Sequence, residues 1–149
     1  MAGTVSVSSV QFNRIPAIAR ALTNDGDRIV AKTAFDVQAA VIESFSGSKT
    51  GRYYAIPGVK SSRQGGGGRR HRASAPGEAP ARLTGALAGS VTVQRSYQRA
   101  VVGVSSSYGP HLEYGTVRMR PRPFLRPVAR KFNVIFEYAV RAMLDRVTR

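Results

Sequence analysis

The segment at residues 108–127, YGPHLEYGTVRMRPRPFLRP, constrains the fold more than any other part of the chain. Pro110 fits the first turn of a short helix, where its missing backbone N–H costs no hydrogen bond. Gly115 is suited to the left-handed conformation that ends such a turn. Two further prolines follow, and a long helical pattern begins directly after them. The segment therefore predicts a junction in which a helical turn, a stiff basic arm and the start of a helix lie close together.

The arm itself is predicted from Pro121 and Pro123, which exclude both a helix and a central strand. Residues 118–122 are therefore expected to run extended. Alternate residues of an extended chain share one side. One edge of the arm would then carry Arg118, Arg120 and Arg122.

Two stripes of apolar residues at steps of three or four predict long helices, at residues 27–45 and at about 124–147. The stripes are Val30, Ala34, Val37, Val41 and Phe45 in the first helix, and Leu125, Val128, Phe132, Ile135, Ala139, Met143 and Val147 in the second. Ile15, Ile18 and Leu22 predict a shorter helix before the first one. The run Asn-Asp-Gly-Asp at residues 24–27 is interpreted as a break between the two, because it combines a flexible residue with capping residues.

Short strands are predicted from alternating apolar residues at 5–12 and 52–56, and from two such runs at 91–97 and 100–104 that form a hairpin turning near Gln98. Pro80 is expected to begin a helix that passes through Leu83 and Leu87 and ends at Gly89. Between the strand at 52–56 and this helix, residues 57–80 lack apolar periodicity. They contain four glycines at 65–68 and a basic run, so we expect a long basic loop that a neighbouring subunit orders.

These elements predict a single α+β domain over residues 1–149, in which a small antiparallel sheet packs against two longer helices. Both stripes are long for so small a sheet, and part of their apolar surface is expected to serve contacts between subunits. There is no cysteine, no N-terminal secretion signal and no apolar run of bilayer length. We therefore expect a protein that is neither secreted nor inserted in a membrane.

Catalytic and metal-binding residues are not predicted. The two histidines, His71 and His111, are forty residues apart, and no cysteine is available as a ligand. His111 lies two residues from Glu113, but side chains at that spacing in a helical turn point apart, which disfavours a Ser–His–acid site. We expect no enzymatic activity, no cofactor and no metal.

The charge is strongly basic and unevenly distributed. The formal net charge of +15 arises after residue 47, because the first 47 residues contain equal numbers of acidic and basic side chains. Such an excess favours an acidic partner, and charge alone leaves nucleic acid, acidic protein surfaces and acidic lipid headgroups open. The candidate contact residues fall in two groups, Arg69, Arg70 and Arg72 in the loop and Arg118, Arg120 and Arg122 in the arm.

Two stretches of the chain resemble the tail-component family of long-tailed bacteriophages, small proteins of the head–tail connector or tail-completion type. The first stretch begins at Gly51-Arg52-Tyr53-Tyr54 and continues through HRASAPGEAP at 71–80 to Thr84-Gly85 and Leu87. The second runs from Leu112-Glu113-Tyr114-Gly115-Thr116 to MRPRPFLRP at 119–127. The positions that carry the resemblance are Tyr53, Tyr54, Pro76, Gly77, Glu78, Pro80, Gly85, Leu87, Glu113, Tyr114, Gly115, Thr116, Pro121, Arg122, Pro123 and Phe124.

The resemblance implies a structural virion protein that is assembled in the host cytoplasm and forms a ring at the head–tail junction. Such a ring joins or seals the tail to the head connector. Its partners would be its own copies, expected as a hexamer with a dodecamer as the alternative, and the connector or stopper, tail terminator or tail tube. Non-specific contact with DNA in the channel is left open. The alternative function is a non-specific nucleic-acid-binding module that uses the basic loop and arm.

Overall fold

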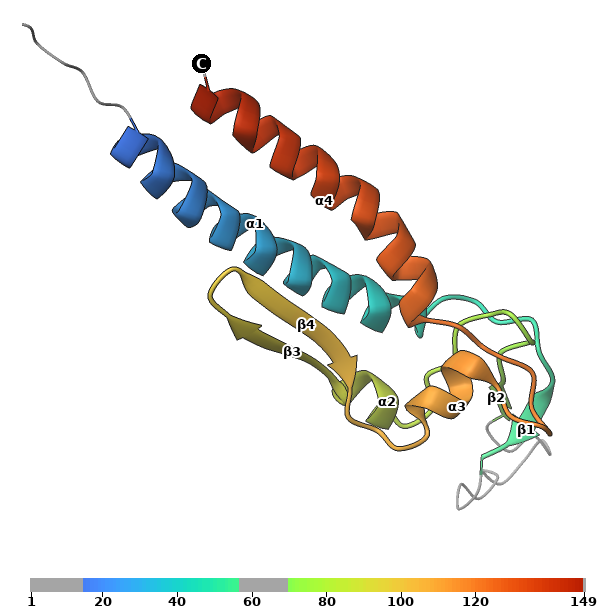
Figure 1. The fold of residues 1–149 in the computed structure, drawn as a ribbon. Coiled ribbons are helices and arrows are strands. Elements are labelled where there is room, and N and C mark those ends of the chain that lie inside the picture. The colour runs from blue at the N-terminus through green and yellow to red at the C-terminus, as the bar shows by residue number, and fades with distance from the viewer. Residues whose placement is uncertain (1–14, 57–69, 149) are drawn as a thin grey trace, which may run out of the picture.

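Two long helices, α1 (Ile15–Ser44) and α4 (Leu125–Thr148), form the body of the molecule. The structure is a computed structural model that describes residues 15–56 and 70–148. The helices pack along each other and run in opposite directions (Figure 1). The predicted stripe includes the buried residues Ala34 and Val41 in α1 and Phe45 directly after its end. The C-terminal helix is confirmed, and it begins one residue after the predicted Phe124.

The predicted break at residues 24–27 is wrong, because α1 continues through it. Asp27, expected to cap a new helix, instead binds the tip of a hairpin. Its carboxylate accepts hydrogen bonds from the Gln98 backbone N–H at 3.0 Å and from Arg95 at 2.5 Å. These long-range bonds hold α1 against the hairpin at the point where local sequence favoured an interruption.

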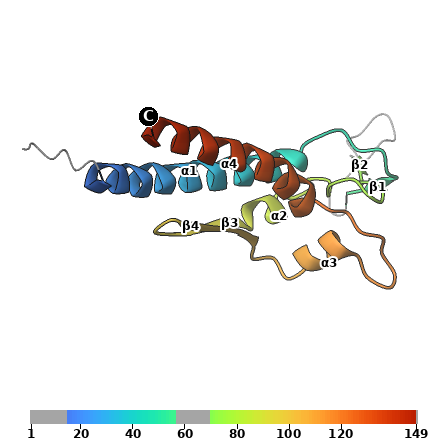
Figure 2. The ribbon, with the colours of Figure 1, turned by 45° about the horizontal axis from the view of Figure 1, so that its top comes forward.

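The hairpin consists of β3 (Val91–Ser96) and β4 (Arg99–Val104), which pair antiparallel as predicted. Tyr97 and Gln98 form the two-residue turn. Figures 1 and 2 show α1 between this hairpin and α4. The α+β class is therefore confirmed, with one correction: the strands form two separate two-stranded sheets.

The second sheet pairs β1 (Tyr53–Ala55) with β2 (Arg70–Arg72) and confirms the strand predicted at 52–56. Because β2 lies within the loop predicted at 57–80, that loop ends earlier than expected. Its glycine-rich part, together with Arg69, lies outside the described residues. The strand predicted at 5–12 also lies outside them.

Two short helices complete the fold. The helix expected from Pro80 is reduced to one turn, α2 (Ala86–Gly89). Gly85, just before it, has a φ of 84°, which a right-handed helix does not allow. Upstream, the Arg82 N–H donates to the Phe45 carbonyl at 3.1 Å, so this segment follows the end of α1. The predicted turn at Pro110 is confirmed as α3 (Gly109–Tyr114).

The buried core lies where both long helices, the hairpin and α2 meet. It contains Val41, Phe45, Ala88, Val91 and Phe124. The rings of Phe45 and Phe124 meet edge to face with centroids 5.2 Å apart. Phe124 is the last residue before α4 and is 1% exposed. It therefore links the arm to the core.

Replacing Phe124 with alanine should reduce the free energy of unfolding by about 3–5 kcal/mol, because it removes a buried ring and leaves a cavity. Chemical unfolding followed by circular dichroism measures the loss. Phe35→Ala is the matched control, since Phe35 is an exposed residue of α1, and this variant should stay close to wild type. Similar losses in the two variants would contradict the core described above.

Candidate functional site

The junction between α3 and α4 is held by one buried carboxylate. Glu113 is 3% exposed. Its Oε2 accepts hydrogen bonds from the backbone N–H groups of Phe124 at 2.8 Å and Leu125 at 3.0 Å, and its Oε1 accepts from that of Arg126 at 2.9 Å. The first N–H groups of a helix have no partner within the helix and carry a partial positive charge. Glu113 therefore caps α4 from another helix.

Arg126, in the first turn of α4, binds both the side chain and the backbone of Glu113. Its Nε donates to Glu113 Oε1 at 3.2 Å and its Nη2 donates to the Glu113 carbonyl oxygen at 3.0 Å. The guanidinium also lies over the Tyr114 ring, 4.7 Å from its centroid. One arginine thus holds the side chain and backbone of Glu113 and the neighbouring ring.

The environment of Glu113 favours its charged form. Burial raises the pKa of the carboxyl, but the three backbone N–H donors and the Arg126 side chain outweigh this effect, so the pKa lies below its ordinary value of 4.5. A carboxyl whose pKa is lower in the folded than in the unfolded protein stabilises the folded state at pH values above its unfolded-state pKa. This contribution is lost as the pH falls through the folded pKa.

The arm, defined here as residues 115–123, begins with a tight turn. Gly115 has the positive φ that was expected, 79°, but its ψ of −179° lies outside the left-handed helical region that was predicted. A Cβ there would lie 2.7 Å from the Met119 carbonyl oxygen. Thr116 and Met119 exchange backbone hydrogen bonds of 2.8 and 3.2 Å. Because the chain reverses between them, the expectation that residues 118–122 run fully extended is wrong at its start.

The three arginines of the arm do not form one edge. Arg118 lies in the turn and is exposed, as is Arg120. Arg122 is half-buried, and its Nε atom is buried. Its backbone N–H donates to the Leu112 carbonyl at 2.7 Å, which fixes the arm against α3. The contact with α3 is what distinguishes Arg122, because Arg120 also follows the Thr116–Met119 turn and is exposed.

A second carboxylate organises the first family-like stretch. Glu78 accepts hydrogen bonds from the backbone N–H groups of Ala75 at 2.9 Å and Thr50 at 3.1 Å, and from the Thr50 hydroxyl. The Thr50 hydroxyl is the main cause that lowers the pKa of Glu78 to about 2, and the two backbone donors add to it. Glu78 thereby ties the turn at 75–78 to the segment before β1.

The two stretches meet at one hydrogen bond. The Gly77 N–H donates to the Pro121 carbonyl at 3.0 Å, so the turn of the first stretch contacts the arm of the second. Gly77 has a φ of 87°, which suits glycine at this turn. The structure therefore brings together segments that are more than forty residues apart in the sequence.

The remaining predicted positions divide into buried and exposed ones. Pro80 is buried, and Leu87 packs against the core. The exposed ones are Tyr53, Tyr54, Pro76, Tyr114, Thr116, Pro121, Arg70 and Arg72. Pro123 is half-buried beside the buried Phe124. Arg72 lies over the Tyr53 ring, 5.2 Å from its centroid.

The capping roles of Glu78 and Glu113 were not predicted from the sequence, although both residues belong to the family-like stretches. One signal was available. Glu78 is the only acidic residue between Glu43 and Glu113, and Glu113 is the only one between Glu78 and Glu137. A lone carboxylate in a basic, proline-rich region is a candidate for a specific structural contact.

Other kinds of site find little support in the described part of the chain. There, no group of three or more His, Cys, Asp or Glu side chains is placed to hold a metal ion, and no helix is long and apolar enough to cross a membrane. His111 is exposed, whereas the neighbouring Glu113 is committed to α4. No protein-family model, curated protein or solved structure matches the chain.

Glu113→Gln should lower the free energy of unfolding at neutral pH by roughly 3 kcal/mol, because a neutral amide cannot accept from all the donors that Glu113 binds. Urea unfolding measures this loss. Glu137→Gln, the same change at an exposed position of α4, should shift stability by less than about 0.5 kcal/mol.

The difference between wild type and Glu113→Gln should shrink as the pH falls below 4.5, the ordinary pKa of this carboxyl. Protonation then removes the charge from the wild-type side chain too, and its contribution to stability is lost. Unfolding curves recorded across this pH range show whether the difference in the free energy of unfolding shrinks or grows as the pH falls. A difference that stayed constant or grew on acidification would show that the charged carboxylate is not the stabilising species.

Proposed function

We propose that this chain is a structural virion protein of a tailed bacteriophage, and that it forms a ring at the head–tail junction. The ring joins or seals the tail to the head connector. This proposal comes from the family resemblance of the two stretches. The observation that supports it most is their contact through Gly77 and Pro121, because separate segments that form one unit are more informative than either segment alone.

Exposed apolar side chains on α4 support assembly into an oligomer. Val134 and Tyr138, one turn apart, are 70% and 76% exposed, and Ile135 beside them is also exposed. We call these three residues the α4 patch. Grouped apolar side chains at a surface commonly mark protein contacts. In this proposal the patch packs against the next copy in the ring, for which six copies are expected and twelve are the alternative.

The charge of the subunit supports contact with acidic partners. With a net charge of +15, copies of the chain repel one another unless other proteins compensate. The adjacent connector or stopper and the tail terminator or tail tube would supply acidic surfaces. In this proposal the exposed Arg118 and Arg120 are candidates for such contacts in the virion. Any contact with DNA in the channel would be independent of its sequence.

The double variant Val134→Asp/Tyr138→Asp should prevent ring formation and leave the subunit folded, because it places charges in the α4 patch without touching the core. Sedimentation velocity gives the assembly state, and circular dichroism gives the melting curve. Tyr97→Asp is the control, since it makes the same type of change at the exposed hairpin tip. Rings that survive the double change would exclude this face as the subunit contact.

The placement in the virion is tested by a phage that carries an early stop codon in this gene. Electron microscopy of the lysate should show filled heads and complete tails that fail to join, or joined particles that leak, because a junction ring performs no earlier step. Stably joined, infectious particles would overturn the proposal.

A non-specific nucleic-acid-binding module is the second candidate. It is favoured by the exposed arginines of the arm and of β2, namely Arg118, Arg120, Arg70 and Arg72. A salt titration with duplex DNA distinguishes it from the ring protein. Tight binding by the free subunit that falls steeply with salt concentration would favour this candidate.

A further inference from the structure

The small sheet formed by β1 and β2 carries an aromatic ring and two arginines on one face. Tyr53 pairs with Arg72 and Ala55 pairs with Arg70 in the register of the two strands. Directly opposite residues of an antiparallel pair project to the same face, as do residues two apart along a strand. Tyr53, Arg70 and Arg72 therefore share a face. All three are exposed, and Tyr53 is 60% exposed.

Local contacts hold Arg72 against the Tyr53 ring. The guanidinium lies over the ring, 5.2 Å from its centroid. Its Nε donates a hydrogen bond to the Gly51 carbonyl at 3.2 Å, and its Nη2 donates to the Thr50 carbonyl at 3.4 Å. Because the ring has two faces and Arg72 lies over one of them, a planar group can stack on the other.

Arg72 also borders an open hollow of about 420 Å³. Four basic side chains from separate segments line this hollow, namely those of Lys49, His71, Arg72 and Arg82. Lys49 is positioned by a hydrogen bond of 2.8 Å from its Nζ to the Ser44 carbonyl. The hollow therefore gathers positive charge beside the Tyr53–Arg72 pair.

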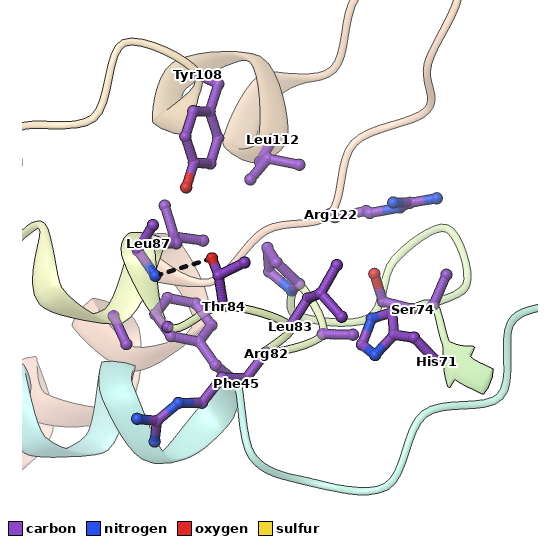
Figure 3. Close-up of a pocket in the computed structure, with 16 residues that line it drawn as sticks. Phe45, His71, Ser74, Arg82, Leu83, Thr84, Leu87, Tyr108, Leu112 and Arg122 are labelled. Carbon is purple, nitrogen blue, oxygen red and sulfur yellow. Dashed lines mark hydrogen bonds between the residues drawn. The ribbon is translucent and has the colours of Figure 1, made fainter. Parts of the chain in front are cut away.

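Arg82 lies between this basic hollow and an apolar cavity beside α3, since it lines both. In Figure 3, which shows the apolar cavity, the Arg82 side chain extends away from Tyr108 and Leu112. Among the described residues, neither a hydrogen bond nor an ion pair holds its guanidinium. Arg82 is exposed and therefore available to a ligand.

The positive charge of the hollow is not balanced from within the chain. No acidic side chain lines it in the described ranges. Glu78 acts electrostatically on Lys49, but its carboxylate accepts hydrogen bonds from Thr50 and Ala75 and does not border the hollow. Residues 57–69, which link β1 to β2, contain no aspartate or glutamate. The hollow is therefore complementary to an anion of another molecule.

An exposed ring beside gathered cations fits a single-stranded nucleic acid. The bases of a single strand expose flat faces that stack on aromatic side chains, and its phosphates bind arginine and lysine. A duplex hides the faces of its bases within the stack, so it would use the cations but not the ring. A carboxylate of an acidic protein would likewise leave the ring unused.

We propose that the β1–β2 sheet and the adjacent hollow bind single-stranded nucleic acid without sequence preference. A base stacks on the open face of the Tyr53 ring, and phosphates of the same strand contact Lys49, Arg72 and Arg82. This site goes beyond both proposed functions, because it lies outside the α4 patch and recognises unpaired bases rather than a duplex. Its test is therefore independent of the test of ring assembly.

Fluorescence anisotropy of the full chain with labelled strands of about eight nucleotides tests the site. Oligothymidylate should bind roughly tenfold more tightly than an abasic strand of the same length, which keeps the phosphates but lacks the bases. Equal affinity for these two strands would overturn the proposal. Polyglutamate that bound as tightly as oligothymidylate would assign the hollow to an acidic protein instead and would also overturn it.

Matched variants assign the binding to particular side chains. Tyr53→Leu should lower the affinity for oligothymidylate about tenfold and leave the affinities for the abasic strand and for a duplex unchanged, because only unpaired bases use the ring. Tyr97→Leu makes the same change at the exposed hairpin tip and should bind like wild type. Arg82→Gln should weaken the binding of both single strands more than Arg118→Gln, which removes a charge from the exposed turn of the arm.

A measurement on the wild-type protein covers the case in which Tyr53→Leu does not fold. The NMR signals of the Tyr53 ring should shift when oligothymidylate is added and should stay in place with the abasic strand. Equal affinities of Tyr53→Leu and Tyr97→Leu for oligothymidylate, or ring signals that do not move, would contradict the proposal.

Discussion

The Glu113 carboxylate is the interaction on which the arrangement of this molecule depends. It lies at the end of α3 and binds the first three N–H groups around the start of α4. Without it, the buried Phe124 N–H and the partly buried N–H groups of Leu125 and Arg126 would lack this acceptor, which is unfavourable, and α4 would have no fixed starting point. The position of Phe124 in the core follows from the same contact, because its own N–H is one of the three donors.

The junction matters for the proposed function because it links distant surfaces. Arg126 fixes Tyr114 on one side, and the arm carries Pro121 to the turn at Gly77 on the other. An arm that is already ordered loses less conformational entropy when it meets a partner. The α4 patch and the exposed arginines of the arm lie on segments that meet at this junction, so a ring of identical copies would present them in a regular way.

Much of the fold was predictable from the sequence because the patterns are local. Helical stripes predicted the two long helices, and alternation predicted the hairpin. Prediction failed where distant contacts decide the conformation. The interruption expected at 24–27 is overridden by the bonds of Asp27 to Arg95 and Gln98, more than sixty residues away. For the site, the positive φ of Gly115 was predicted from backbone geometry alone, although its ψ of −179° differs from the predicted left-handed conformation. The role of Glu113, and the bond of Glu78 to Thr50, depend on donors that come near them only after folding.

The central claim is that the charged Glu113 side chain holds the N-terminus of α4. Residue-specific amide hydrogen exchange at neutral pH tests it most directly, through the N–H groups of Phe124, Leu125 and Arg126. In the wild-type protein these three amides should exchange slowly, although no helical carbonyl accepts from them. In Glu113→Gln they should exchange much faster than the amides in the middle of α1. Equal protection of the three amides in both proteins would contradict the account.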